Sequence, residues 1–205
     1  MAALTDQDRA RVEAAVAAAE RRTSAEFAVA VAHASDDYAL YPLVGAAMIA
    51  LIVGDIVALA VPRLTTFWLV VLQAALFVVA DLVLHWSPVR HRLVPARVKK
   101  SHAGRLAKAQ FAALVRNRTP DAVGVLLFVS VAEHHVEILV DRGIAARIDQ
   151  AVWEKVIADF VAAVRAGHVA AALIGAIDAG TAILEKHFPP SPGAPNTIPD
   201  QVTEL

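Results

Sequence analysis

The sequence contains no cysteine and almost no net charge. The absence of cysteine excludes disulfides, thiolate zinc sites and cysteine nucleophiles. The formal charge of −1 excludes a global electrostatic field that would attract nucleic acid or anionic surfaces. The N-terminal stretch, residues 1–22, lacks an apolar core, so we do not expect it to be a secretory signal peptide.

Familiar catalytic patterns are also missing. The sequence has no Ser/His/Asp signature, no glycine-rich loop that cradles phosphate and no H-E-x-x-H zinc motif. His134 and His135 are adjacent, and we expect them in a turn, where neighbouring side chains point apart and do not easily share one metal. The catalytic residues are therefore unknown from the sequence, and we expect a protein that is not an enzyme.

Apolar residues are what the sequence has in excess, at 58%. They concentrate at residues 43–61 and 67–86, and each segment approaches the length of about 20 residues that a helix needs to cross a bilayer. The single Asp in each segment costs about 2.5–3.5 kcal/mol, and each Leu, Ile, Val or Phe contributes about −0.3 to −0.6 kcal/mol. Because both segments are rich in these apolar residues, we expect a transmembrane hairpin with its turn at residues 62–66. Two buried helices of a soluble protein are the alternative.

Lysine and arginine are distributed unevenly around the two segments. The turn carries only Arg63, whereas several basic residues flank the two segments on the other side: Arg21, Arg22, Arg90, Arg92, Arg97, Lys99 and Lys100. Because basic loops stay in the cytoplasm, we expect a multi-pass protein of the inner (cytoplasmic) membrane with both soluble parts cytoplasmic. The basic run directly abuts a span, which favours attraction to anionic membrane lipid over binding of nucleic acid.

Polar and small residues inside the expected spans indicate how the two helices contact each other. Asp55 and Gln73 fall at similar depth in a hairpin, so we expect a hydrogen bond between them, and Asp81 lies one turn from His85. Small residues recur at every fourth position of the first span: Ala46, Ala50, Gly54 and Ala58. Such a stripe allows close helix packing, either within the hairpin or between copies in a homo-oligomer.

Outside the spans, helix and strand patterns alternate. We expect helices near residues 5–22, 97–115, 150–166 and 169–187, and strands near 26–33, 123–131 and 136–141. The run 123–131 is apolar throughout, which is typical of a central strand buried on both faces, so we expect a three-layer α/β/α domain. The expected domains are residues 1–40 and 88–188 for the two parts of the α/β domain, 41–87 for the transmembrane hairpin, and 189–205 for a proline-rich disordered tail.

Several short motifs resemble those of the TPM domain family. They are ERRTSAE at residues 20–26, VGVLLFVS at 123–130, AE at 132–133, DRGI at 141–144, Trp153 and HFP at 187–189. The pattern is most similar to a bacterial branch of membrane proteins in which a two-helix hairpin splits the domain. The resemblance implies a TPM-like α/β/α fold with an inserted two-helix transmembrane hairpin. Relatives in the thylakoid lumen are associated with phosphatase activity and calcium binding.

The candidates for such chemistry lie at one end of the expected sheet. Asp121 and Asp141 share that end if the strands 123–131 and 136–141 are antiparallel, and their carboxylates suit calcium or magnesium, with Arg142 nearby to hold phosphate. Solvated loop charges are the alternative interpretation. Two hypotheses therefore remain. One is a non-catalytic interaction or scaffolding module that binds a membrane-protein partner or copies of itself. The other is a metal-assisted phosphatase.

Overall fold

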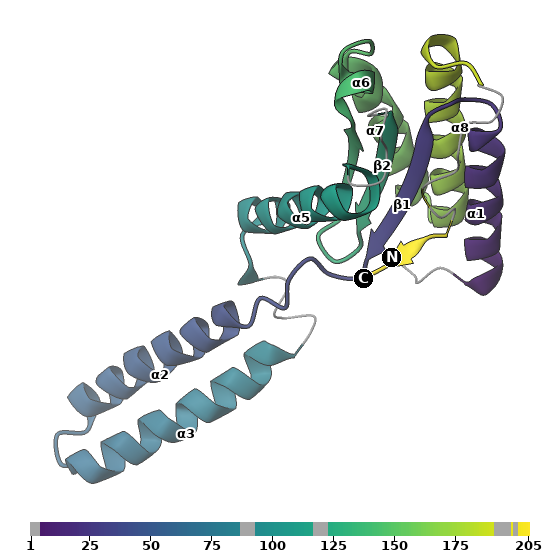
Figure 1. Cartoon of the computed structure of the whole chain (residues 1–205). Helices are drawn as coiled ribbons and strands as arrows, with labels where there is room; N and C mark the ends of the chain where they lie inside the picture. The colour runs from purple at the N-terminus through teal and green to yellow at the C-terminus, as the bar shows by residue number, and fades with distance from the viewer. Residues whose placement is uncertain (1–4, 87–92, 117–122, 191–197, 199–200) are drawn as a thin grey trace. The chain divides into compact units, whose positions relative to one another are not determined.

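Figure 1 shows a computed structural model of the chain, in which residues 5–86, 93–116, 123–190, 198 and 201–205 are described. The chain divides into two compact units. Residues 1–35 and 100–205 form an α/β unit, and residues 36–99 form a second unit built mainly of two long helices. The α/β unit is thus assembled from two stretches of sequence that are far apart along the chain.

A four-stranded sheet forms the centre of the described α/β unit, in the order β3-β2-β1-β4. β1 (Glu26–Ala32) and β2 (Gly124–Ser130) are parallel neighbours, although the whole second unit separates them in sequence. β3 (His135–Val140) is antiparallel to β2, because only a short turn joins the two. β2 is buried along its whole length, which confirms that the apolar run is a central strand.

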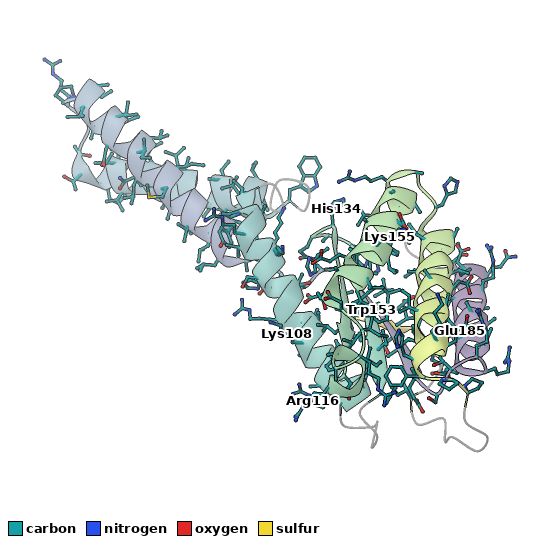
Figure 2. All side chains as sticks on the ribbon, turned by 90° about the horizontal axis from the view of Figure 1, so that it is seen from above. Lys108, Arg116, His134, Trp153, Lys155 and Glu185 are labelled. Atoms are coloured by element: carbon teal, nitrogen blue, oxygen red, sulfur yellow. The ribbon has the colours of Figure 1, made fainter. Side chains whose placement is uncertain are left out.

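Helices cover both faces of this sheet. α1 (Asp6–Glu20), α7 (Gln150–Arg165) and α8 (Val169–His187) lie side by side on one face, with α8 in contact with both others (Figure 2). α5 (Ala96–Phe111) and a wider π turn at Ala112–Arg116 cover the other face. Alternate strand residues point into two separate apolar cores, as the two-residue period of a strand requires. The three-layer arrangement expected from the sequence is therefore present.

Both cores contain aromatic side chains, among them Phe111 and Phe128 beneath α5, but small residues make up half of the buried residues beneath α5. The core beneath α1, α7 and α8 contains large aromatic side chains: Phe27, Trp153 and Phe160. The core beneath α5 is lined by small residues of β1 and of the helix itself: Ala28, Ala30, Ala32, Ala103 and Ala107. Small side chains on both surfaces allow the helix backbone to lie close to the strand.

Capping residues fix where the helices of this unit begin and end. The side chain of Thr5 accepts a hydrogen bond from the amide of Asp8 at the start of α1, and Asp149 accepts one from Ala151 at the start of α7. Gly167 follows α7 with φ of 91°, a left-handed conformation that costs glycine little. All three positions agree with the helix bounds expected from the sequence.

The prediction of a disordered tail over residues 189–205 is wrong for its last residues. Thr203–Glu204 form β4, which pairs in parallel with β1, and Ile198 is buried. The guanidinium of Arg9 donates a hydrogen bond to Glu204 at 2.6 Å, and this bond raises the pKa of Arg9 above its usual value. The free edge of β1 offers unpaired backbone groups, and the last five residues, which contain no proline, can pair with them. Most of the proline-rich stretch lies outside the described residues.

The second unit consists mainly of α2 (Leu40–Ala60) and α3 (Thr66–His85), which pack against each other (Figure 1). Both helices are long and apolar enough to cross a membrane. No residue of α3 is buried, and large apolar side chains such as Leu59 and Leu82 are 83% and 76% exposed. The pair therefore presents an apolar surface on the outside.

Candidate functional site

At the end of the sheet where the sequence places Asp141, carboxylates accept hydrogen bonds from backbone amides. The amide of Asp141 donates a hydrogen bond to the carbonyl oxygen of Gly124 at 2.9 Å, so Asp141 lies beside the start of β2 as expected. Its carboxylate accepts a hydrogen bond from the amide of Arg142 at 2.7 Å and caps the short helix α6 (Arg142–Ala145). Asp121, the second expected metal ligand, lies outside the described residues. The grouping of Asp121, Asp141 and Arg142 therefore stays a prediction.

A second carboxylate at this end also binds backbone. Glu26, at the start of β1, accepts a hydrogen bond from the amide of Ile198 at 2.7 Å. In the part of the chain that the structure describes, no three His, Asp or Glu side chains come together in a way that could hold a metal ion. A calcium or magnesium ion would have to compete with these backbone hydrogen bonds for the carboxylate oxygens.

A polar cluster lies at the opposite end of the sheet, where the parallel strands β1 and β2 end. The hydroxyl of Ser130, a residue with 0% exposure, donates a hydrogen bond to the carboxylate of Glu133 in the turn before β3. The amide of Ser35 donates to the same carboxylate at 3.1 Å, and the two serine hydroxyl oxygens are 2.8 Å apart. These three residues, the serine–glutamate cluster, tie the end of β1 to the β2–β3 turn. Ser35 is also the residue at which the chain leaves the α/β unit.

The β2–β3 turn separates the two adjacent histidines. His134, labelled in Figure 2, is exposed and has φ of 51°, which is uncommon for a residue with a side chain. His135 begins β3, and its Nε2 lies 3.2 Å from Oε2 of Glu137. The two imidazoles therefore have different surroundings.

A cavity of about 290 Å³ lies beside this turn, between α7 and the ends of β2 and β3. Its walls are mostly apolar: Val129, Val136, Phe160, Val161 and Val164. Its polar groups come from Ser130, His134, His135 and Arg165. The Ser130 hydroxyl donates its hydrogen bond to the carboxylate of Glu133 and not to a histidine of the cavity. The arrangement suits the binding of an apolar group with one polar end.

The stripe of small residues in α2 serves packing between the two helices of the second unit. Ala46, Ala50 and Gly54 are buried, and Ala58 is half-buried. A Cβ atom on Gly54 would lie 2.5 Å from Cγ of Gln73, so glycine allows an approach that a larger residue would prevent. This contact supports the first of the two interpretations of the stripe, packing within the pair.

Of the two contacts expected among the polar residues of α2 and α3, one is found among the described residues. The side chain of Gln73 packs on Gly54, whereas Asp55 is exposed, so the expected hydrogen bond between Gln73 and Asp55 is absent from the described contacts. The amide side chain fills the space beside the glycine because the helices approach closely there. Asp81 lies as expected one turn from His85, with Oδ1 3.0 Å from Nδ1.

The sequence pattern does not identify Ser35 and Ser130 as members of a site. Glu133 is visible only as an acidic residue in an expected turn. A signal does exist, because Ser130 is the one side chain with a polar group in the run GVLLFVS at residues 124–130, and Ser35 follows shortly after the other parallel strand. Only the parallel pairing of β1 and β2 shows that these two strand ends are neighbours.

Comparisons with known proteins agree with this architecture. Residues 98–183 match the family model of the TPM domain. This range contains β2, β3 and α7, the stretch whose motifs resemble that family most specifically. No curated protein matches the chain.

One solved structure has a similar fold. It is the NMR structure of BA42 protein from the psychrophilic bacterium Bizionia argentinensis sp. nov., with a TM-score of 0.62 and 16% sequence identity. The alignment covers 98% of this chain and 95% of that chain. At this identity the similarity concerns the fold alone.

Proposed function

We propose that this chain is a membrane-anchored protein in which α2 and α3 cross the inner membrane and hold the TPM-like α/β unit at the cytoplasmic face. There the α/β unit acts as a non-catalytic interaction or scaffolding module. The observation that carries the proposal is the exposure of large apolar side chains over α2 and α3. In water this surface would be strongly unfavourable, whereas lipid accommodates it.

The dimensions of the helices support this assignment. α2 contains 21 residues and α3 contains 20. At about 1.5 Å per residue each helix is about 30 Å long, which matches the hydrocarbon core of a bilayer. Buried helices of a soluble core would instead hide their apolar side chains, so their exposure favours spans over the alternative of a soluble protein.

Membrane insertion is tested by alkaline carbonate extraction of membranes from cells that express the full chain. We expect the protein to stay in the pellet, because a spanning helix pair leaves the bilayer only when detergent dissolves it. Release into the supernatant, together with purification as a soluble monomer without detergent, would overturn the anchored function.

Orientation can be tested with single cysteines, because the chain has none of its own. Arg63→Cys places a thiol in the turn between α2 and α3, and Ser101→Cys places one in α5. In intact cells we expect a membrane-impermeant maleimide to label residue 63 and not residue 101, in line with the distribution of basic residues. Permeabilised cells provide the control, in which both variants should react. The reverse labelling would place the α/β unit outside the cytoplasm.

The interaction role is supported by the absence of a complete catalytic set among the described residues and by the cavity beside the β2–β3 turn, whose walls are mostly apolar. It predicts a particle larger than the monomer in mild detergent, formed with a membrane-protein partner or with further copies. Crosslinking in intact membranes before solubilisation, followed by mass spectrometry, tests this. A monomer without any crosslinked partner would contradict the scaffolding role while leaving the membrane anchor intact.

The metal-assisted phosphatase hypothesis can be separated from the interaction role by Asp141→Asn. Asn caps a helix about as well as Asp, so the variant should keep α6 but lose the charge that calcium or magnesium needs. If our proposal is correct, calorimetry on the protein in detergent will show no calcium or magnesium binding that depends on this residue. Metal binding and phosphate-ester hydrolysis that are both lost in the variant would favour the phosphatase.

A further inference from the structure

α5 carries charge of only one sign. Its 16 residues include no Asp or Glu, and its Lys and Arg residues are Arg97, Lys99, Lys100, Arg105 and Lys108. The whole chain has a formal charge of −1, so this positive charge is a local feature. A helix with such a composition has a positive surface potential over its exposed face.

The packing of α5 directs these charges outward. Ala103, Ala107 and Phe111 are buried against the sheet, which fixes the orientation of the helix about its own axis. Four of the basic residues are exposed, and we call them the basic face of α5: Arg97, Lys100, Arg105 and Lys108. Lys108 projects away from the sheet in Figure 2. None of the four forms an ion pair with another described residue, so their charge is not neutralised within this part of the chain.

The connection to α3 limits how far α5 can lie from the end of that helix. α3 ends at His85 and α5 begins at Ala96. A fully extended connection of this length spans at most about 40 Å. If α3 crosses a membrane, the N-terminal end of α5 stays within this distance of the headgroups on that side, where anionic lipids create a negative surface potential.

We propose that the basic face of α5 binds the headgroups of anionic phospholipids at the cytoplasmic surface of the membrane. The inference rests on the proposed function, because it requires α3 to end at that surface. Lipid is favoured over nucleic acid since the tether keeps lipid headgroups permanently at high local concentration. Binding of this kind would draw α5, and with it the α/β unit, toward the bilayer in response to lipid composition.

The test uses the full chain with Ser101→Cys, reconstituted into nanodiscs and labelled with a fluorophore. Ser101 is exposed, and its place in the helical repeat puts it between Arg97 and Arg105 on the basic face. The discs contain either phosphatidylcholine alone or an equal mixture with phosphatidylglycerol, and both contain a headgroup spin-labelled lipid as quencher. We expect severalfold stronger quenching in the phosphatidylglycerol discs and loss of the difference at high salt. Equal quenching in both lipids would overturn the proposal.

Two matched variants separate the basic face from total charge. One changes the four basic-face residues to Gln, and the other changes an equal number of exposed Arg and Lys residues in or directly after the helices of the other layer: Arg11, Arg21, Lys155 and Lys186. Both variants lose the same charge, yet only the first should lose the lipid-dependent quenching. Equal loss in both would show that overall charge and not α5 is responsible, and would overturn the assignment.

A single-stranded RNA oligonucleotide is the competitor in the same assay. If the basic face binds lipid, equimolar RNA will leave the quenching unchanged at physiological salt. Removal of the quenching by RNA would show that the basic face binds nucleic acid instead and would overturn the proposal. Failure of the membrane anchor itself is detected separately, by carbonate extraction, so the two ideas can fail independently.

Discussion

Replacement of Glu133 by Ala should destabilise the α/β unit more than its position in a surface turn suggests. The carboxylate of Glu133 accepts hydrogen bonds from the hydroxyl of Ser130 and from the amide of Ser35. Ser130 is completely buried, so water does not reach its hydroxyl, and the Ser35 hydroxyl 2.8 Å away is the acceptor that remains. A hydrogen bond to a charged group contributes about 1.5–3 kcal/mol, whereas one between two neutral groups contributes about 0.5–1.5 kcal/mol. Because the amide of Ser35 also loses its acceptor, we expect Glu133→Ala to lower the free energy of unfolding by about 2–3 kcal/mol.

A double-mutant cycle tests the reasoning behind that magnitude. Ser130→Ala removes the same hydrogen bond to Glu133 but leaves this carboxylate with the amide of Ser35, so it should cost about 1.5 kcal/mol. The double variant loses the shared hydrogen bond only once. Its cost should consequently be smaller than the sum of the two single costs by about 1 kcal/mol or more.

The assay is urea unfolding of the full chain in mild detergent, followed by the fluorescence of Trp153. This side chain is 1% exposed in the core beneath α1, α7 and α8. Trp68→Phe in α3 and Trp86→Phe directly after it remove the other tryptophan signals. Glu154→Ala on the exposed side of α7 is the matched control and should change the free energy of unfolding by less than about 0.5 kcal/mol. Strict additivity in the cycle, or a Glu133→Ala effect no larger than the control, would refute the account of the cluster.

Three further predictions concern single positions. Gly175→Ala should stabilise the α/β unit by about 1 kcal/mol, because residue 175 lies inside α8 with no atom within 4 Å of the added Cβ. Gly167→Ala should destabilise the unit by about 1 kcal/mol, because φ of residue 167 is 91°. Urea unfolding that gave the two changes in free energy the same sign would contradict this. Gly54→Ile should lower the temperature at which α2 and α3 lose helical circular dichroism in detergent, and Ala58→Ile, at a half-buried position, should lower it less. Asp141→Ala should cost about 0.5–2 kcal/mol through loss of the α6 cap, and an equal loss in Asp141→Asn would show that capping is not the reason.

Local sequence patterns predicted most elements of the fold. The apolar run at residues 123–131 corresponds to β2, and the caps at Thr5 and Asp149 mark the starts of α1 and α7. These features depend on neighbouring residues alone, since strand burial and helix capping are set within a few positions of the chain. The small-residue stripe around Gly54 was equally visible, but its partner Gln73 was not, because the rotation of α3 about its axis depends on packing.

The candidate site was less predictable for the same reason. Asp141 stands out as an acid at a strand end, yet its carboxylate caps α6, and the sequence alone does not separate a cap from a metal ligand. Ser35 and Ser130 carry no motif, and their contact depends on strands separated by the whole second unit. The final strand β4 likewise depends on a free sheet edge that exists only after β1 and β2 have paired.

The sequence by itself determined the composite character of this protein: two long apolar segments placed between two stretches with the alternating patterns of an α/β fold. Those patterns are local, because hydrophobic periodicity and length act through contiguous residues. The tertiary structure alone decided which strand ends meet, which carboxylates accept hydrogen bonds from backbone amides, and which face of α5 is left exposed. These properties depend on contacts between residues far apart in the chain, and such contacts form only when the sheet and its two layers of helices are complete.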